Sequence, residues 1–451
     1  MARVGELLEL DLTDLGRDGR GLGRHDGQVV FVDGGLPGER VLARVTARGR
    51  GHLVGQLKQV LRHSPERRPP PCILADHCGG CGLQPLVDQA QRHWKEEMVR
   101  QTLRRIGHLD VPVRPLMGAE GGLGYRNRAL IPLERTADGR LRAGYYRRGT
   151  HRIVNMNHCP VLDSRIDALI GPLKADLEAS GWPVDRHAGA ASRTGLRHLG
   201  LRLGSHSGEL LILLISSHDR LPGLEELALR WMARWPDLVG VVLNLQPLPT
   251  NVLLGPESRT IAGRGWLNES FAGVNLRIAA DTFFQVNTPQ AERVVPLLRQ
   301  ALGEVPGRLV DACSGIGTFS LPLALDGWQV HGIEQQGGAV ELARANAARH
   351  GLEERVVFEL AEVAGVLAER LEGVDALFVD PPRKGLDGRA MEAIGTQPPP
   401  VLLYLSCDPA TLARDLGRLC GDGPFVPRLV QPFDFFPNTT HVETLVVLDR
   451  R

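Results

Sequence analysis

Three cysteines within ten residues have a spacing that suits a metal site. Cys72, Cys78 and Cys81 form a C-x5-C-x2-C run, and the two glycines between Cys78 and Cys81 let both thiolates reach one centre. Cys159 is the best fourth ligand, because the other cysteines of the chain lie in a different region. Four cysteines suit an iron-sulfur cluster or a structural zinc ion. General frequency slightly favours zinc, and four unrelated thiols are the alternative.

Cys407 suggests a different chemistry, that of a nucleophile. It follows the apolar run 401–405, and Asp408 and Pro409 after it indicate a loop. A thiol at a strand end is partly exposed and able to attack an electrophile, whereas a buried, inert thiol is the alternative. Polar residues follow other apolar runs in the same way, at Asp311, Glu334, Asp380-Pro381-Pro382-Arg383 and Thr440-His441-Val442-Glu443. Because the carboxyl ends of parallel strands meet at one edge of a sheet, we expect one shared site.

A glycine-rich turn predicts a nucleotide-like cofactor at this edge. Gly315 and Gly317 follow an apolar run, and Glu334 comes nineteen residues after Gly315, where a carboxylate can bind two ribose hydroxyls. A tight turn between strand and helix is the alternative. Ser320 stands where a dinucleotide enzyme needs a third glycine, which disfavours hydride transfer. S-adenosylmethionine fits the pattern better.

The elements that must position these residues follow a regular strand, loop and helix rhythm after residue 280. The expected strands are short apolar runs at 308–311, 329–333, 356–358, 376–380 and 401–405. Between them, a helix over 339–350 has a continuous apolar face, and Gly351 stands where a left-handed C-cap belongs. This alternation predicts an α/β fold with a parallel sheet covered by helices on both faces.

The first 280 residues predict two further domains. Short β-branched runs between glycine-rich turns indicate a small β-barrel over 1–62, and the proline-rich run 65–71 marks a connector. An α+β central region follows, with a helix near 86–106 and hairpins at 125–154 and 197–217. We therefore expect domains at 1–62, 63–278 and 279–451.

Composition indicates a folded chain rather than a disordered or fibrous one. The 451 residues are 43% hydrophobic and 23% charged, with a formal net charge of +1. No apolar run is long enough for a membrane span, and the first residues lack the apolar core of a signal peptide. The chain has seven cysteines, an odd number that favours metal-binding or reactive thiols over disulfides. We expect a cytoplasmic protein with no membrane association and no obligate protein partner.

One segment is strongly basic although the whole chain is nearly neutral. Between Arg100 and Arg152 there are twelve arginines and four acidic residues. Arginine matches phosphate geometry, so the segment suggests RNA or another polyanion, with an ordinary solvated surface as the alternative.

Together these motifs resemble the RNA (uracil-5-)-methyltransferase family over nearly the full length. The matching runs are Phe283-Phe284-Gln285-Val286-Asn287, Asp380-Pro381-Pro382-Arg383-Lys384-Gly385-Leu386, Ser406-Cys407-Asp408-Pro409-Ala410-Thr411-Leu412-Ala413-Arg414-Asp415 and His441-Val442-Glu443, in the family's order. The resemblance implies a C-terminal Rossmann-like class I methyltransferase domain that uses S-adenosylmethionine. It also implies an N-terminal RNA-binding barrel of the TRAM type. The four cysteines look like the family's 4Fe-4S ligands, which reverses the preference for zinc.

The resemblance assigns roles residue by residue. It implies that Cys407 is the nucleophile and Glu443 the base. The positions implied to contact the cofactor or target base are Gln285, Cys313, Gly315, Thr318, Glu334, Glu362 and Asp380. Three of them depart from the family pattern: Cys313 replaces an aromatic residue, Thr318 an asparagine, and Glu362 an aspartate or asparagine. Asp408 likewise stands where the family has asparagine after the nucleophile.

The chemistry of uracil explains why a thiol and a carboxylate are needed. C5 is a poor nucleophile until a thiolate adds at C6, and the adduct then carries a C5 hydrogen that a carboxylate must remove. Arg383 and Lys384 are the expected positive charges near the thiol. The target uridine must leave its stack to reach such a pocket.

The resemblance also suggests which RNA is the substrate. Members with a barrel and a cluster resemble 23S ribosomal RNA enzymes more than transfer RNA enzymes, so 23S RNA is preferred and a tRNA uracil-5-methyltransferase is the alternative. A catalytically idle RNA-binding assembly protein is a second alternative. Radical chemistry is disfavoured because four cysteines leave no open iron, and amino-group methylation because Arg383 replaces a stacking aromatic residue.

Overall fold

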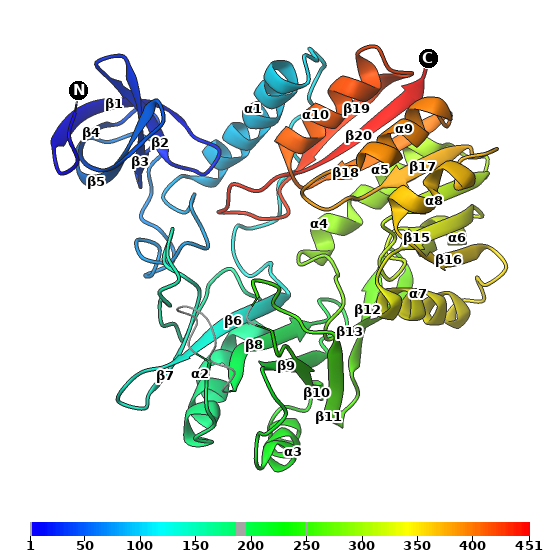
Figure 1. The fold of residues 1–451 in the computed structure, drawn as a ribbon, viewed down its shortest axis with the longest axis horizontal. Coiled ribbons are helices and arrows are strands. Elements are labelled where there is room, and N and C mark those ends of the chain that lie inside the picture. The colour runs from blue at the N-terminus through cyan, green and yellow to red at the C-terminus, as the bar shows by residue number, and fades with distance from the viewer. Residues whose placement is uncertain (1, 186–194, 249) are drawn as a thin grey trace.

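The computed structural model describes residues 2–185, 195–248 and 250–451, and it begins with a closed barrel (Figure 1). Its strands are β1 (Leu7–Leu15), β2 (Gly21–His25), β3 (Gln28–Asp33), β4 (Arg40–Gly49) and β5 (His52–Arg62), in the spatial order β1-β2-β3-β5-β4. Alternate side chains of β1, including Leu8, Leu10 and Leu12, fill the interior, as the period of two in a strand requires.

The proline-rich connector is held against the barrel. Arg67 donates through Nε and Nη2 to the two carboxylate oxygens of Glu39, at 2.6 and 2.8 Å, and Glu39 is fully buried. A bidentate pair of this kind fixes direction as well as distance. The barrel therefore joins the rest of the chain through a fixed connector.

A six-stranded mixed sheet forms the middle of the molecule, in the order β11-β10-β9-β8-β6-β7. Its strands are β6 (Arg128–Arg135), β7 (Leu141–Ala143), β8 (Leu196–Leu203), β9 (Leu210–Ser216), β10 (Leu238–Leu245) and β11 (Glu257–Gly263). Helices α2 (Ser164–Ala179) and α3 (Leu224–Arg234) cover one face, and the hairpin β12 (Trp266–Phe271) and β13 (Val274–Ala279) follows.

Strand β9 shows how this sheet is joined to the C-terminal part. Ile212 and Leu214 pack in the core under α2 and α3, whereas Leu211, Leu213 and Ile215 belong to a core shared with the C-terminal sheet. Because both faces are buried, the strand is apolar at every position but its last, rather than alternating.

The C-terminal part is a seven-stranded sheet in the order β16-β15-β14-β17-β18-β20-β19. Its strands are β14 (Arg308–Ala312), β15 (Gln329–Glu334), β16 (Val356–Leu360), β17 (Ala376–Val379), β18 (Val401–Ser406), β19 (Phe425–Phe433) and β20 (Glu443–Arg450). The first five are parallel, and β20 runs antiparallel to both β18 and β19. The strand order reverses at β14, because β15 and β16 lie on one side of it and β17 and β18 on the other.

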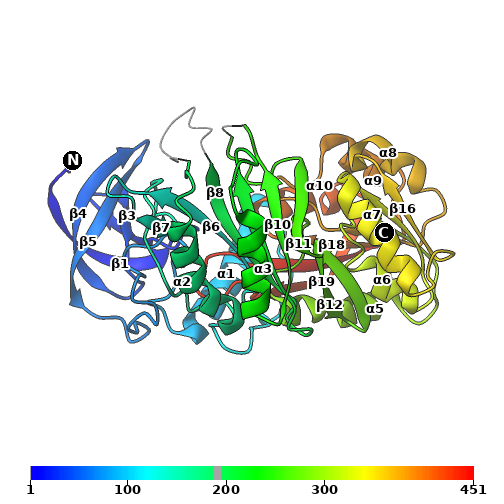
Figure 2. The ribbon, with the colours of Figure 1, turned by 90° about the horizontal axis from the view of Figure 1, so that it is seen from below.

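Helices cover both faces of this sheet (Figure 2). They are α4 (Thr288–Glu292), α5 (Val294–Leu302), α6 (Ser320–Leu325), α7 (Gly337–Arg349), α8 (Val363–Arg370), α9 (Gly388–Thr396) and α10 (Pro409–Cys420). Helix α1 (Asp88–Ile106) lies inside the predicted central region but packs against α10. The two helices approach so closely that a Cβ atom at Gly107, directly after α1, would lie 2.7 Å from the carbonyl oxygen of Ala413.

The predicted fold class is confirmed. The five predicted strands and the 339–350 helix match observed elements to within two residues at each end, and Gly351 has the left-handed φ of +62° expected of its C-cap position. Both hairpins form, although β6 and β7 span less than 125–154. No helix in the described ranges combines the length and apolar character needed to cross a membrane.

Candidate active site

Cys407 and Glu443 lie at adjacent ends of two paired strands. Cys407 follows the last residue of β18, and Glu443 is the first residue of β20. The register pairs Ser406 with Thr444, so the next step of the ladder places Cys407 opposite Glu443. The thiol is half-buried and Glu443 is buried. The antiparallel insertion of β20 thus brings the predicted nucleophile and the predicted base together.

Burial and like charges disfavour ionisation of both groups. Burial raises the pKa of the Cys407 thiol to about 12, with Glu443 and Asp380 adding to the shift. Burial likewise raises the pKa of the Glu443 carboxyl to about 8, again with a contribution from Asp380. The Arg383 guanidinium acts in the opposite direction on both groups. Strongly shifted, mutually coupled groups at a strand edge are typical of a reaction centre.

Arg383 is held near these groups by His441. Its Nη2 atom donates to His441 Nε2 at 3.3 Å. Burial lowers the pKa of His441 to about 4, with Arg383 itself contributing, so the imidazole is neutral at neutral pH and accepts this hydrogen bond. The single positive charge of the pair therefore stays on Arg383.

Asp408 has a structural task next to the predicted nucleophile. Its Oδ1 atom accepts a hydrogen bond from the Thr411 backbone nitrogen at 2.8 Å, which caps the N-terminus of α10, and Pro409 occupies the first turn. The helix N-terminus favours an anion nearby, including a thiolate at Cys407. An aspartate in place of the family's asparagine keeps this cap.

The glycine-rich turn after β14 leaves open space for a ligand. Cys313, Gly315 and Gly317 have φ angles of +74°, +57° and +85°, and a side chain at Gly315 would meet no atom within 4 Å. Glu334, at the end of β15, accepts hydrogen bonds from the backbone nitrogens of Gly315 (3.1 Å) and Gln336 (2.9 Å). The predicted cofactor turn and the predicted ribose carboxylate are therefore in direct contact.

Two buried acids connect this turn with Cys407. Burial raises the pKa of Asp311 to about 7, with Glu334 contributing, and burial raises that of Asp380 to about 7, with Asp311 contributing. In the described part of the chain, Asp311 Oδ1 and the buried Ser314 hydroxyl have no hydrogen-bond partner. This edge thus carries several acidic and polar groups that a cationic ligand would satisfy.

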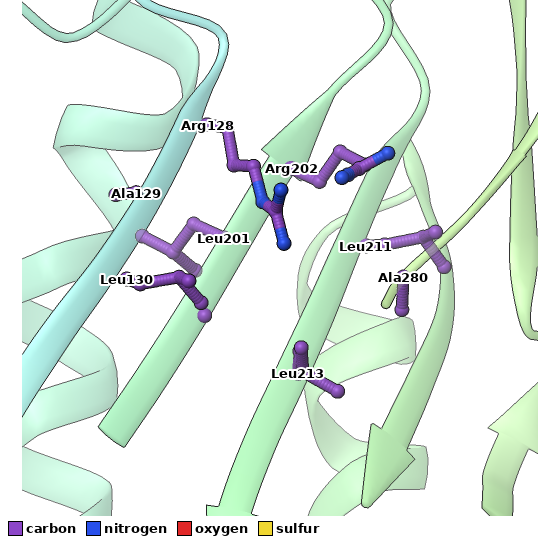
Figure 3. Close-up of a pocket in the computed structure, with 9 residues that line it drawn as sticks. Arg128, Ala129, Leu130, Leu201, Arg202, Leu211, Leu213 and Ala280 are labelled. Atoms are coloured by element: carbon purple, nitrogen blue, oxygen red, sulfur yellow. The ribbon is translucent and has the colours of Figure 1, made fainter. Parts of the chain in front are cut away.

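Gln285 lies on a loop that the central sheet holds in place. Asn127 Nδ2 donates to the Gln285 carbonyl oxygen at 3.1 Å and to Thr288 Oγ1 at 2.9 Å. Arg202 donates to the Thr282 carbonyl oxygen of the same loop, from the small cavity where it lies beside Arg128 (Figure 3). Burial lowers the pKa of Arg128 to about 10, with Arg126 contributing to the shift.

Two predicted cofactor residues have less evident positions. Thr318 is buried between the glycine turn and α6. Glu362 follows β16 and is exposed, and within the described residues its carboxylate has no hydrogen bond or ion pair with the other predicted site residues. Cys313 lies close to Asp380 and Glu334, since after burial these two charges contribute most to raising its pKa to about 12.

The four predicted metal ligands approach one another without forming a single-ion site. Burial raises the pKa of Cys81 to about 11 and of Cys159 to about 12, and the other cysteines of the set add to both shifts. Gly79, between Cys78 and Cys81, packs against the backbone of Arg148. A Cβ atom at position 79 would lie only 3.0 Å from that backbone. Across the described ranges, no three His, Cys, Asp or Glu side chains are arranged to hold one metal ion. The metal site stays a prediction.

Sequence reasoning missed the long-range polar contacts that support the site. Lys95 is fully buried and pairs at 2.6 Å with Asp434, the first residue of the connection between β19 and β20. Asn127 and Asn438 are also buried. In the sequence these residues have polar or charged neighbours, so no local pattern marks them as buried. Tyr125, within the basic segment, donates its hydroxyl to the Pro437 carbonyl oxygen, and Tyr145 packs against the central core, so both contribute to packing.

Comparisons with known proteins agree with this architecture. The model of the tRNA (uracil-5-)-methyltransferase family matches residues 269–451, and the model of the TRAM domain matches residues 2–58. The chain is 50% identical to an uncharacterized RNA methyltransferase of Parasynechococcus marenigrum, over 99% of this chain and 96% of that protein. It is 43% identical to an uncharacterized RNA methyltransferase of Synechocystis sp., over 98% and 96%.

A solved structure has the same full-length architecture. Pyrococcus abyssi tRNA (uracil-54, C5)-methyltransferase, in complex with S-adenosyl-L-homocysteine, is 26% identical with a TM-score of 0.77, over 98% of this chain and 100% of that chain. Together with the full-length relatives and the family models, it shows that this chain is an RNA methyltransferase and belongs to the RNA (uracil-5-)-methyltransferase family, in a form with an N-terminal TRAM domain.

Proposed function

We propose that the protein methylates C5 of a uridine in RNA, with S-adenosylmethionine as methyl donor, through a transient bond between Cys407 Sγ and uracil C6. The observation that carries the proposal is the pairing of β18 with β20, which sets Cys407 beside Glu443, with Asp380 and Arg383 electrostatically coupled to both. A nucleophile next to a base on rigid strands is the arrangement that this reaction needs.

Each residue has a defined task in the proposed reaction. Cys407 loses its thiol proton to water and its thiolate forms a bond to C6, which moves the π electrons of C5=C6 onto the C4 oxygen as an enolate. S-adenosylmethionine supplies an electrophilic methyl group, which C5 takes as the enolate collapses, while the S–CH3 bond breaks and S-adenosylhomocysteine leaves as the neutral thioether. Glu443 then takes the C5 proton, the electrons of the broken C–H bond restore C5=C6, and Cys407 leaves as a thiolate. Arg383 stabilises the anionic forms of Cys407 and Glu443.

The cofactor assignment fits the charges at the strand edge. Gly315 offers a close backbone approach, and Glu334 offers acceptors for ribose hydroxyls. Asp311 and Asp380 are acids that burial keeps partly protonated, and the sulfonium and amino groups of S-adenosylmethionine are cations that favour their ionised forms. The structure of the P. abyssi enzyme holds S-adenosyl-L-homocysteine, the product of the same donor.

This fit predicts that S-adenosylmethionine binds more tightly as pH rises. Asp311 and Asp380 have raised pKa values of about 7 in the free protein, so below pH 7 binding must first remove a proton. We expect the affinity to rise roughly tenfold between pH 6 and 8 and then to level off. Calorimetry at several pH values measures it.

S-adenosylhomocysteine, whose thioether sulfur carries no charge, is the matched control ligand, and its affinity should change less with pH. The variant Glu225→Gln should leave the profile of S-adenosylmethionine unchanged, because Glu225 is an exposed carboxylate on α3, which packs on the central sheet rather than on the C-terminal one. Equal pH profiles for both ligands would contradict the proposed charge coupling.

We further propose that Cys72, Cys78, Cys81 and Cys159 hold a 4Fe-4S cluster. Their thiols influence one another electrostatically, and a four-iron cluster takes one thiolate per iron, so its ligands lie further apart than those of a single zinc ion. Cys72 is held by a hydrogen bond from its backbone nitrogen to Gln84 Oε1 (3.1 Å), and Cys159 by one from its backbone nitrogen to Asp167 Oδ1 (2.6 Å). Analysis for iron, acid-labile sulfide and zinc tests the assignment.

For the RNA substrate we propose 23S ribosomal RNA, modified in the cytoplasm. The support is the combination of a TRAM barrel with the four-cysteine set, and the basic segment 100–152 provides arginines for phosphate contacts. Transfer RNA is the second candidate, because the full-length structural neighbour is a tRNA (uracil-54, C5)-methyltransferase.

The experiment that tests the proposed function measures tritium released from uracil C5. Separate unmodified pools of ribosomal and transfer RNA, labelled at that position, are incubated with the protein and S-adenosylmethionine. We expect release from ribosomal RNA that depends on the cofactor, because the C5 hydrogen must leave as a proton. Release from transfer RNA alone would assign the second substrate. Cofactor binding without release from either pool would contradict the proposed chemistry and favour an idle RNA-binding protein.

A further inference from the structure

The chain segment that precedes Glu443 is a buried connection between β19 and β20. We call residues 434–442 the base loop. Most of its residues are buried, although it has no helix or strand of its own. Because Glu443 is the first residue of β20, the path of the base loop sets how its carboxylate enters the site.

Asn438 makes the densest set of contacts in the base loop. It is fully buried, with a left-handed φ of +66°. Its Oδ1 atom accepts hydrogen bonds from Arg68 Nη2 (3.0 Å) and Gln91 Nε2 (3.1 Å), and its Nδ2 atom donates to the Gly122 carbonyl oxygen (2.6 Å). Its backbone nitrogen donates to Gln91 Oε1 at 2.9 Å, and its carbonyl accepts from the Leu83 nitrogen at 2.9 Å.

These contacts join four segments that are distant in sequence. Arg68 belongs to the barrel connector, Leu83 follows the cysteine run, Gln91 is on α1, and Gly122 lies in the loop before β6. A left-handed backbone conformation costs a residue other than glycine free energy, so it persists only where surrounding contacts hold it, and such positions concentrate at functional sites.

Other contacts fix the first half of the base loop but not its second half. Lys95 Nζ donates to Asp434 (2.6 Å) and to the Phe436 carbonyl oxygen (2.9 Å), and Asn287 Nδ2 donates to the Phe435 carbonyl oxygen (3.0 Å). After Pro437, the hydrogen bonds that tie the loop to other described segments are those of Asn438 and the contact of Arg383 with His441. Asn438 is therefore the fully buried anchor of the stretch between Pro437 and Glu443, which pairs with Phe433 of β19.

We propose that Asn438 is a positioning residue that aims Glu443 at the C5 proton after methyl transfer. This inference rests on the proposed covalent mechanism. In that mechanism Cys407 forms the C6–S bond, and only the later step, removal of the C5 proton with expulsion of the thiolate, needs Glu443. Loss of the Asn438 contacts therefore slows the second step and leaves the first unchanged.

The variant Asn438→Gly separates the side chain from the backbone conformation. Glycine adopts a φ of +66° without strain, so the loop keeps its backbone path while the three side-chain hydrogen bonds are lost. On labelled uridine RNA we expect tritium release to slow roughly tenfold or more, because small misplacements of a reacting group have effects of that size. A protein–RNA adduct that survives denaturing electrophoresis should accumulate.

RNA that contains 5-fluorouridine isolates the first step. A fluorine at C5 cannot leave as a cation, so the adduct is trapped whatever Glu443 does. We expect Asn438→Gly and the wild type to form this trapped adduct at rates within about twofold of each other. A merely destabilised fold would slow both reactions together.

Two further variants complete the test. Asn244→Ala removes an equally buried asparagine, whose amide holds the segment 255–258 against β10, far from the site, and it should show no adduct on ordinary RNA. Gln91→Leu removes two hydrogen bonds to Asn438 without changing the base loop sequence, and it should give a smaller effect of the same kind. This second variant keeps the test decisive if Asn438→Gly folds poorly.

The outcomes separate this inference from the proposed function. A wild type that forms no adduct with fluorinated RNA would overturn both. A wild type that forms the adduct, with unchanged release in Asn438→Gly and Gln91→Leu, would overturn the positioning role alone. Equal adduct accumulation in Asn244→Ala would also overturn it, because the effect would then reflect general loosening.

Discussion

Substituting Cys407→Ala is expected to lower the rate of RNA methylation by roughly 10⁴-fold or more, because uracil C5 becomes nucleophilic only after a thiolate adds to C6. Cys407 lies at the end of β18 and is half-buried, so its loss should leave the sheet intact. The affinity for RNA and for S-adenosylmethionine should stay within about twofold of the wild type, because most of the binding surface is unchanged. Transfer of the labelled methyl group measures the rate, and filter binding measures the affinity.

The control for this variant is Cys420→Ala, which makes the same change in a buried cysteine at the end of the adjacent helix α10. It should retain nearly full activity. Substantial methylation by Cys407→Ala would defeat the covalent mechanism, whereas loss of activity in both variants would point to a packing defect.

Substituting Glu443→Gln is expected to reduce product release by about 10² to 10⁴-fold and to trap the protein on its RNA. The amide keeps the size of the side chain but cannot take the C5 proton. Burial and Asp380 raise the pKa of Glu443 to about 8, so the folded protein already disfavours its charge and the neutral amide should not weaken the fold. Denaturing electrophoresis with labelled RNA detects the trapped adduct.

The double variant Cys407→Ala, Glu443→Gln identifies the bond in that adduct. It should form none, because the sulfur atom that bonds to C6 is gone. Glu443→Gln with normal release would exclude Glu443 as the base and direct attention to Asp380, the other carboxyl coupled to Cys407.

Much of the C-terminal domain was predictable from local sequence. Strands such as β14 and β18 are short apolar runs, and the residues directly after them, Cys313 and Cys407, mark the turns at the carboxyl edge. Parallel strands place those turns along one edge whatever the rest of the fold does. The glycine turn and Glu334 were therefore expected to meet, and they do so through the Gly315 hydrogen bond.

The remaining features of the site depend on which segments pack together. Local sequence specifies the strands, the helices between them and the polar residues at each strand end, because periodicity and turn chemistry are encoded by near neighbours. Only the tertiary structure inserted β20 between β18 and β19, set Glu443 beside Cys407, and tied Asn438 to residues more than 300 positions away. It also decided the shifted pKa values of Asp311, Asp380 and Glu443. Burial and like-charge proximity cause those shifts, and both arise only when segments distant in sequence exclude water from the same place.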